Sequence, residues 1–159
     1  MGLDMYLYGS LSTYKYDCGQ NKIDNEELHK FLAEKLKGYK PCENLASIDV
    51  RFEIGYWRKA NQIHAWFVKN VQDGKDECEL VGLGREELVA LRDLCKQVLA
   101  MKGQPEEKIR EKLPPQDGFF FGGTDIDKWY WGDLEHTIKV CDYALSLPER
   151  VSFAYQSSW

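Results

Sequence analysis

The sequence lacks long apolar runs, is poor in proline and has no excess of basic residues. No apolar stretch approaches the roughly 18 residues of a membrane-spanning helix, and the opening MGLD does not resemble a signal peptide. Five prolines in 159 residues exclude a collagen-like or low-complexity chain. The 21 basic and 26 acidic residues give a net charge of −5, which argues against duplex nucleic acid, because phosphate neutralisation requires a basic surface. We expect a cytoplasmic protein that binds neither membranes nor duplex nucleic acid.

Cysteine and histidine are also sparse, and their spacing fits neither disulfides nor metal ions. The cysteines are odd in number and contain no CxxC pair. The histidines never occur four residues apart, the spacing that places two imidazoles on one helical face. We therefore expect reduced thiols, no metal site and no cofactor. The cysteines are Cys18, Cys42, Cys78, Cys95 and Cys141, and the histidines are His29, His64 and His136.

Apolar residues recur with two different periods along the chain. Alternation or short apolar runs predict strands near 3–8, 48–54, 78–81, 118–123 and 151–155. Helical stripes predict long helices from 56 to about 72, after a cap at Gly84 with a stripe at 88–99 and a break at 102–105, and from about 131 to near Pro148. They also predict a short helix from Pro105 to about Lys112 and a further helix near 25–37. We expect one α+β or α/β domain over 1–159, with a mixed sheet of about five strands packed with three long helices and one short helix.

The predicted helix at 56–72 places polar residues on its apolar side. At 100° per residue, His64 falls inside the apolar arc and Asn61 lies at its rim. Trp57, Asn61 and His64 follow the spacing i, i+4, i+7, so they align along one side of the helix. His64 should therefore be enclosed, with at least one polar neighbour. It is either a core histidine with a hydrogen-bond partner or, together with Asn61, a group that faces a ligand.

Two cations follow Gly55 at the start of the same predicted helix. Arg58 and Lys59 would lie in its first turn, where free backbone N–H groups and the helix dipole favour an anion. Glu53 or Asp49 from the preceding strand could neutralise them, or a bound phosphate or carboxylate could do so. Both alternatives stay open at this point.

Aromatic residues cluster in two other places. Trp66 lies on the polar side of the 56–72 helix, where an aromatic ring can stack on a base or contact a partner protein. Six of the thirteen residues from Phe119 to Trp131 are aromatic, and we expect most of them to fill the core. Between them, Gly122 and Gly123 lack the spacing of a phosphate-binding loop, so Thr124 or Asp125 is expected to cap the last helix.

Four segments carry a resemblance to other proteins. They read MGLDMYL at 1–7, YWRKANQIHAWFV at 56–68, GFFFG at 118–122 and YQSSW at 155–159. Together they resemble a set of short, uncharacterised phage and bacterial proteins that open with MGLDMYL and carry a YWRKANxIHxWFV helix. The resemblance spans the chain and implies a single domain and a phage or prophage setting. It brings no activity, cofactor or catalytic residue.

These observations favour a protein that binds a small anionic ligand such as a nucleotide. The two cations would supply charge, the polar side chains orientation, and the nearby aromatic rings stacking. The expected ligand-binding residues are Trp57, Arg58, Lys59, Asn61, His64 and Trp66.

Two alternative functions remain open. One is an enzyme that acts on a phosphorylated or nucleotide-like small molecule, with His64 as general acid or base and Glu53, Asp49 or Asp4 as its orienting carboxylate. The other is a protein that binds another protein through Trp66 and exposed tyrosines, for example a host-directed inhibitor.

Overall fold

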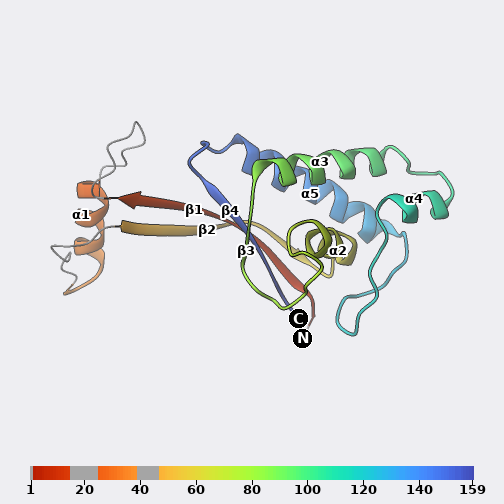
Figure 1. Ribbon diagram of the computed structural model, residues 1–159, viewed down its shortest axis with the longest axis horizontal. Helices are drawn as coiled ribbons and strands as arrows, with labels where there is room; N and C mark the ends of the chain where they lie inside the picture. The colour runs from red at the N-terminus through yellow and green to blue at the C-terminus, as the bar shows by residue number, and fades with distance from the viewer. Residues whose placement is uncertain (1, 15–24, 39–46) are drawn as a thin grey trace. The chain divides into compact units, whose positions relative to one another are not determined.

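The computed structural model describes residues 2–14, 25–38 and 47–159. In these residues the chain is α+β, with four strands in one antiparallel sheet of order β2-β1-β4-β3 (Figure 1). The expected α+β class is therefore confirmed, while the sheet has four strands rather than about five and is antiparallel rather than mixed. The strands are β1 (Asp4–Tyr14), β2 (Ser47–Arg58), β3 (Val81–Leu83) and β4 (Ser152–Ser158). The helices are α1 (Asn25–Lys35), α2 (Asn61–Asn70), α3 (Arg85–Leu99), α4 (Glu106–Lys112) and α5 (Lys128–Ser146).

The chain divides into two compact units. One unit, Ser10–Arg51, contains α1, which lies where the sequence predicted a helix near 25–37. The side chain of Phe31 in that helix and that of Leu36, which directly follows the helix, are exposed. The other unit, Met1–Gly9 with Phe52–Trp159, contains the remaining helices and the residues of the candidate site.

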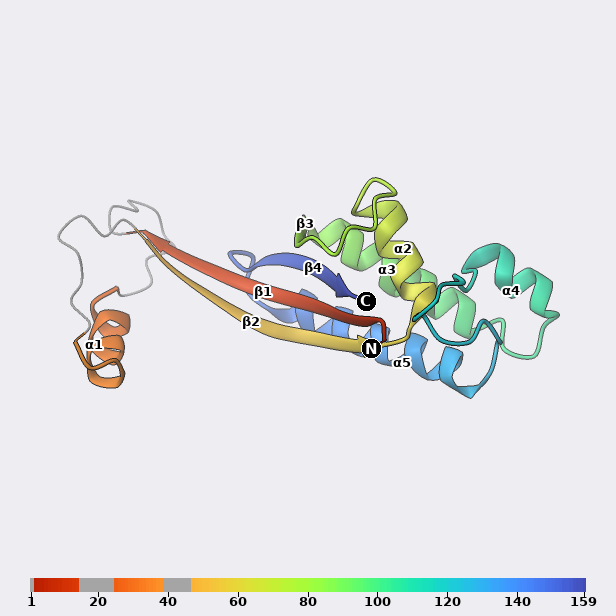
Figure 2. The same cartoon turned by 90° about the horizontal axis from the view of Figure 1, so that it is seen from below.

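The core of this larger unit lies between the sheet and three helices. Along β1 every second side chain, from Leu3 through Met5 to Leu7, is fully buried, as the alternating sequence predicts. The ring of Phe67 from α2 stacks on Tyr155 of β4 with the centroids 3.9 Å apart. Strand β4 runs beside β1 in the opposite direction (Figure 2). The period-two pattern thus places one face of the sheet in the core.

Helices α3 and α5 lie side by side and pack through apolar stripes (Figure 1). The stripe that the sequence predicts for α3 is largely buried, and α5 meets it with small and apolar side chains. The buried residues are Leu88, Leu91, Cys95 and Val98 on α3, and Leu134, Cys141 and Ala144 on α5. Burial raises the pKa of the Cys141 thiol to about 12, so this thiol is a small apolar group rather than a nucleophile.

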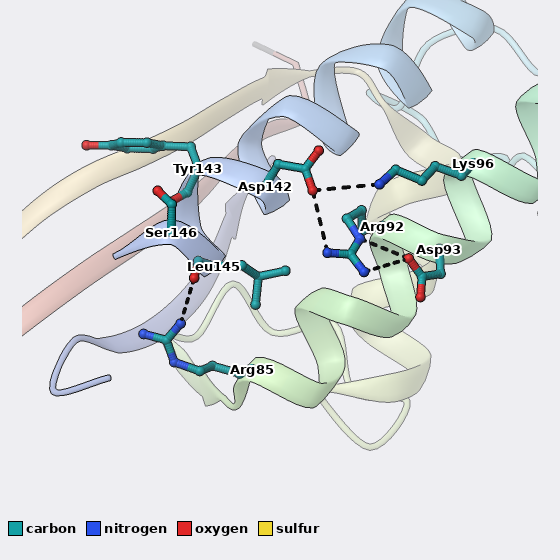
Figure 3. A network of polar contacts seen from close by, with 8 residues as sticks. All are labelled: Arg85, Arg92, Asp93, Lys96, Asp142, Tyr143, Leu145 and Ser146. Carbon is teal, nitrogen blue, oxygen red and sulfur yellow. Dashed lines mark hydrogen bonds and ion pairs between the residues drawn. The ribbon is translucent and has the colours of Figure 1, made fainter. Parts of the chain in front are cut away.

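Arg85 joins the start of α3 to the end of α5 (Figure 3). Its guanidinium donates to the carbonyl oxygens of Leu145, Leu147 and Pro148 at distances of 3.2, 2.9 and 2.7 Å. The Leu145 and Leu147 carbonyls lie where the helix ends and lack helical partners, while the Pro148 carbonyl also accepts from the Val151 N–H at 3.0 Å. A cation also suits the negative end of the helix dipole. The contact fixes the connection from α5 into β4.

The largest difference from the sequence expectation lies at Gly55. The sequence predicts a strand that ends at Gly55 and a helix from Tyr56, but β2 continues to Arg58. A Cβ added at Gly55 would lie 2.4 Å from Cγ1 of Val140 on α5, so this glycine is a point of close approach rather than a strand end. The exposed Tyr56 and the buried Trp57 continue the alternation of the strand.

A tight turn separates β2 from α2. Lys59 adopts φ 60, in the left-handed region that favours glycine. Ala60 follows at φ −76 and ψ 67, and the Asn61 N–H donates to the Lys59 carbonyl at 2.9 Å, which is the geometry of an inverse γ-turn. The expectation that Arg58 and Lys59 lie in the first turn of a helix is therefore wrong. Arg58 ends the strand, and Lys59 occupies the turn.

The segment before α5 also differs from the expectation. No strand forms at 118–123; instead the Phe121 N–H donates to the Gly118 carbonyl at 3.1 Å in a turn that leaves Phe119 94% exposed. The helix is capped by Asp127, whose Oδ1 accepts from the N–H groups of Trp129 and Tyr130 at 2.8 and 3.1 Å. Neither Thr124 nor Asp125 serves as the cap.

Two smaller expectations concern thiols and membranes. Cys78, Cys95 and Cys141 are free, as expected, while Cys18 and Cys42 lie outside the described residues. None of the helices in the described ranges has the length and apolar character needed to cross a bilayer.

The close contact at Gly55 gives the first prediction. Gly55→Ala should lower the free energy of unfolding by about 1–3 kcal/mol, because the new methyl group overpacks against Val140. In urea titrations Val140→Ala should partly rescue Gly55→Ala, so that the two effects are not additive. Gly82→Ala is the control, since its Cβ would meet nothing closer than 3.9 Å. Equal losses at Gly55 and Gly82 would contradict the assigned contact.

Candidate functional site

A cavity of about 420 Å³ opens beside the turn between β2 and α2. This volume falls within the range of small-ligand sites. Its wall combines two cations, three carboxylates, two carboxamides and two aromatic rings, with the remaining surface from proline and glycine. The lining residues are Arg58, Lys59, Asn61, Gln62, Pro115, Gly122, Gly123, Asp125, Asp127, Trp129, Tyr130 and Asp133.

Lys59 reaches this cavity from a crowded position between two glycines. A Cβ at Gly122 would lie 3.2 Å from Cβ of Lys59, and a Cβ at Gly2 would lie 3.3 Å from its Cε. Larger residues at either place would displace the lysine stem. The positive φ of Lys59 costs a non-glycine residue on the order of 1–2 kcal/mol. A strained residue that lines a cavity is a common feature of binding sites.

Arg58 and Lys59 are both exposed, and neither forms an ion pair with any residue that the structure describes. In particular, Glu53 and Asp49 do not pair with them, although the sequence allowed either carboxylate to do so. The two cations are thus adjacent in the chain and line one cavity, and no described carboxylate lies within ion-pair distance of either, although three aspartates line the same cavity.

Asn61 shapes the opposite part of the wall through its side-chain amide. Its Nδ2 donates to the carbonyl oxygens of Phe121 and Gly123 at 3.2 and 2.8 Å, and its Oδ1 accepts from the Gln116 N–H at 3.1 Å. These three bonds hold the loop that precedes α5 against the start of α2. Asn61 therefore lines the cavity as a positioning residue with its amide already engaged.

Helix α5 contributes an aromatic ring and a carboxylate. Trp129 is 70% exposed, and Asp133 follows it by four residues, so both lie on the same side of the helix. The Gln62 Nε2 donates to Asp133 Oδ2 at 3.0 Å and links α5 to the first turn of α2. Tyr130 is buried, and its hydroxyl donates to the Leu113 carbonyl at 2.8 Å.

Burial raises the pKa of Asp133 from an ordinary value of 3.8 to about 6. The hydrogen bond from Gln62 and the nearby His136 partly offset this effect by lowering the pKa, whereas Asp127 raises it. The charged form of Asp133 is therefore poorly stabilised by the protein alone.

His64 lies elsewhere, in the core, and is fully buried, which confirms the expected enclosure and polar neighbours. Its Nδ1 lies 2.8 Å from the Tyr155 hydroxyl, and its Nε2 lies 2.9 Å from Asp76 Oδ2. The other oxygen of Asp76 accepts from the Trp159 indole N–H at 3.0 Å. Both ring nitrogens are thus engaged within the protein.

The carboxylate beside His64 is Asp76, from the segment after α2, and not one of those considered from the sequence. Asp4 instead accepts a hydrogen bond from the Tyr56 hydroxyl. His64 is not part of the cavity wall. Its contacts with Tyr155 and Asp76 are those of a core histidine whose polar atoms have partners.

The two tryptophans expected near a ligand do not line the cavity either. Trp57 is buried and its indole N–H donates to the Thr137 hydroxyl at 2.9 Å. Trp66 is half-buried and packs edge-on against Phe67. The cavity therefore brings together Arg58, Lys59 and Asn61 from the expected set, and it leaves out Trp57, His64 and Trp66.

Sequence reasoning overlooked Gln62, Trp129 and Asp133. The signal for the last two was present, because they are four residues apart on α5 and off its apolar stripe. Gln62 carried no such signal, since the incorrect helix start placed it on the solvent side.

Within the described ranges, no cluster of three or more histidine, cysteine or acidic side chains could hold a metal ion. Comparisons with protein-family models, curated proteins and solved structures found no match.

The raised pKa of Asp133 predicts a specific dependence of stability on pH. The folded state holds this proton more tightly than the unfolded chain, so the contribution of Asp133 falls as pH rises from about 3.8 to about 6. The full shift corresponds to about 3 kcal/mol, which partial exposure reduces to roughly 1–2 kcal/mol.

Asp133→Asn removes this titration and keeps an acceptor for Gln62. The free energy of unfolding of the variant relative to wild type should therefore increase by roughly 1–2 kcal/mol between pH 4 and pH 7.5. Urea denaturation at both pH values measures the difference. A constant difference would show that Asp133 titrates normally in the folded protein.

Proposed function

We propose that this protein binds a small anionic ligand, with nucleotides as the favoured class, in the cavity beside the β2–α2 turn. Arg58 and Lys59 receive the phosphate or other anionic group, and Trp129 offers a surface on which a planar ring can stack. Asn61 holds the wall in place. The proposal assigns stacking to Trp129 rather than to Trp57 or Trp66.

The observation that carries the proposal is a pair of cavity-lining cations that form no ion pair with any residue of the described ranges. In a folded protein, two neighbouring cations repel each other unless anions or solvent screen them. Lys59 is in addition held in a strained backbone conformation, where glycine would be less costly. An anion in the cavity would offset the repulsion between the two cations.

The aromatic ring supports a ligand with a planar part. Trp129 is 70% exposed although it stands in the first turn of a long, well-packed helix. Base–aromatic stacking contributes on the order of 1–3 kcal/mol per base. A nucleotide combines an anionic group with such a ring, and 420 Å³ is large enough for a ligand of moderate size.

The position of His64 favours binding over catalysis. A general acid or base must come within about 2.6–3.2 Å of the proton that it transfers. The imidazole of His64 is fully buried and its two nitrogens face Tyr155 and Asp76.

Charge removal tests the proposal. Arg58→Ala and Lys59→Ala should each weaken binding of pyrophosphate and of nucleoside monophosphates by about 10- to 150-fold, the equivalent of one charge-assisted hydrogen bond. The melting temperature without ligand should change little, because neither cation has a described internal partner. Calorimetric titration and thermal-shift assays measure the two quantities.

Lys75→Ala is the matched control, because Lys75 is exposed and lies outside the cavity wall. It should bind as wild type does. If the Arg58 and Lys59 variants bind like the control, the cations do not receive the ligand. If wild type binds neither pyrophosphate nor any nucleoside monophosphate, the proposal fails and a protein partner becomes the better explanation.

A further inference from the structure

We infer that the ligand of this cavity is a purine whose ring edge carries adjacent N–H donors, as guanine does, with its ring on Trp129 and its donors on Asp133. The inference rests on the proposed function and identifies the part of the ligand that is not anionic, which is the base with its N–H donors. It assigns to Asp133 a role in specificity that is separate from the anion-binding role of Arg58 and Lys59.

The spacing on α5 brings the ring and the carboxylate within reach of one base. Residues four apart on a helix have Cβ atoms about 5–6 Å from each other. A base stacked on the Trp129 indole therefore presents its edge close to Asp133. The Lys128 ammonium lies 4.9 Å from the centroid of the indole; since an indole has two faces, one face remains for the base.

Asp133 has unused hydrogen-bonding capacity. Its Oδ2 accepts from Gln62, whereas no residue of the described chain donates to its Oδ1. A carboxylate can accept about four hydrogen bonds, and a partly buried carboxylate is costly unless such bonds are made. N–H donors on a ligand would satisfy it directly.

The cavity wall carries groups of both charges. The β2–α2 turn supplies two cations, while α5 supplies Asp133 and the loop before α5 supplies the exposed Asp125. Asp127 also lines this wall, but its Oδ1 is engaged as the helix cap. A ligand that is anionic throughout would be repelled at the α5 wall, so its second end must donate hydrogen bonds.

Guanine meets this requirement better than the other bases. Its ring N–H and its amino group are adjacent donors that can bind one carboxylate in parallel, and such bidentate, charge-assisted pairs are strong. Hypoxanthine lacks the amino group and retains one donor. In uracil the ring N–H lies between two carbonyl oxygens, which repel a carboxylate.

The test compares GMP, IMP, UMP and pyrophosphate on wild type and on two variants of α5. Wild type should bind GMP at least about tenfold more tightly than IMP, and UMP most weakly of the three nucleotides. Asp133→Asn should reduce the GMP-to-IMP ratio to near one, and pyrophosphate affinity should not fall, because the change removes a negative charge from the cavity wall. Glu135→Gln is the matched control, because Glu135 is an exposed residue of the same helix outside the cavity wall.

The outcomes separate the inference from the proposed function. Equal affinities of GMP, IMP and UMP for wild type, or an unchanged GMP-to-IMP ratio in Asp133→Asn, would overturn the inference while Arg58-dependent binding of pyrophosphate still stands. If wild type binds none of the four compounds, both the inference and the proposed function are overturned. A melting curve for each variant checks that a lost preference does not reflect unfolding.

Discussion

The shape of the candidate site depends on the side-chain amide of Asn61. This one group donates two hydrogen bonds to, and accepts one from, the backbone of the loop that precedes α5. Asn61 is 2% exposed and its bond to the Phe121 carbonyl is buried, so losing this bond would leave a buried carbonyl group unpaired. The amide thereby holds Gly122 and Gly123 against the turn that carries Lys59, and these residues together form part of the cavity wall.

The turn itself depends on contacts that lie far apart in the sequence. Gly55 lets β2 pass close to Val140 of α5, and the strand then continues to Arg58. The Lys59 N–H donates to the Leu3 carbonyl at 2.8 Å, which fixes the turn against the first residues of the chain. The left-handed conformation of Lys59 follows from these constraints rather than from its own preference. The neighbouring cations are therefore held at the cavity by the packing of the sheet and α5.

Much of the fold follows from residue patterns. Alternation predicted the buried faces of β1 and β4, and apolar stripes predicted α3 and α5, because in these elements local periodicity and tertiary burial agree. The residue patterns predict the wrong local structure where a contact with a residue distant in the sequence determines the backbone conformation. Gly55 is a stop signal in isolation, but in the structure it is the place where α5 approaches. Likewise, the apolar run at 118–123 forms a turn because Asn61 binds the carbonyls of Phe121 and Gly123.

The candidate site could be predicted only in part, because its side-chain chemistry is visible in the sequence but the contacts that assemble it are not. The chemical character of Arg58, Lys59 and Asn61 was visible in the sequence, although their local structure was not. His64 attracted a functional interpretation because it is polar on an apolar arc, and its contacts with Tyr155 and Asp76 account for it within the core. The sequence predicts that most of the six aromatic residues from Phe119 to Trp131 fill the core without singling out Trp129, which its position off the α5 stripe leaves exposed.

The most direct measurement of the central claim is a titration of isotope-labelled protein with GMP, followed by NMR. The proposed site predicts that the largest shifts occur at the backbone amides of 58–62 and 122–125 and at the Trp129 indole N–H. The indole N–H of the buried Trp57 should shift little, because it is engaged with Thr137 outside the cavity. Shifts confined to other parts of the chain, or none at saturating GMP, would contradict the account.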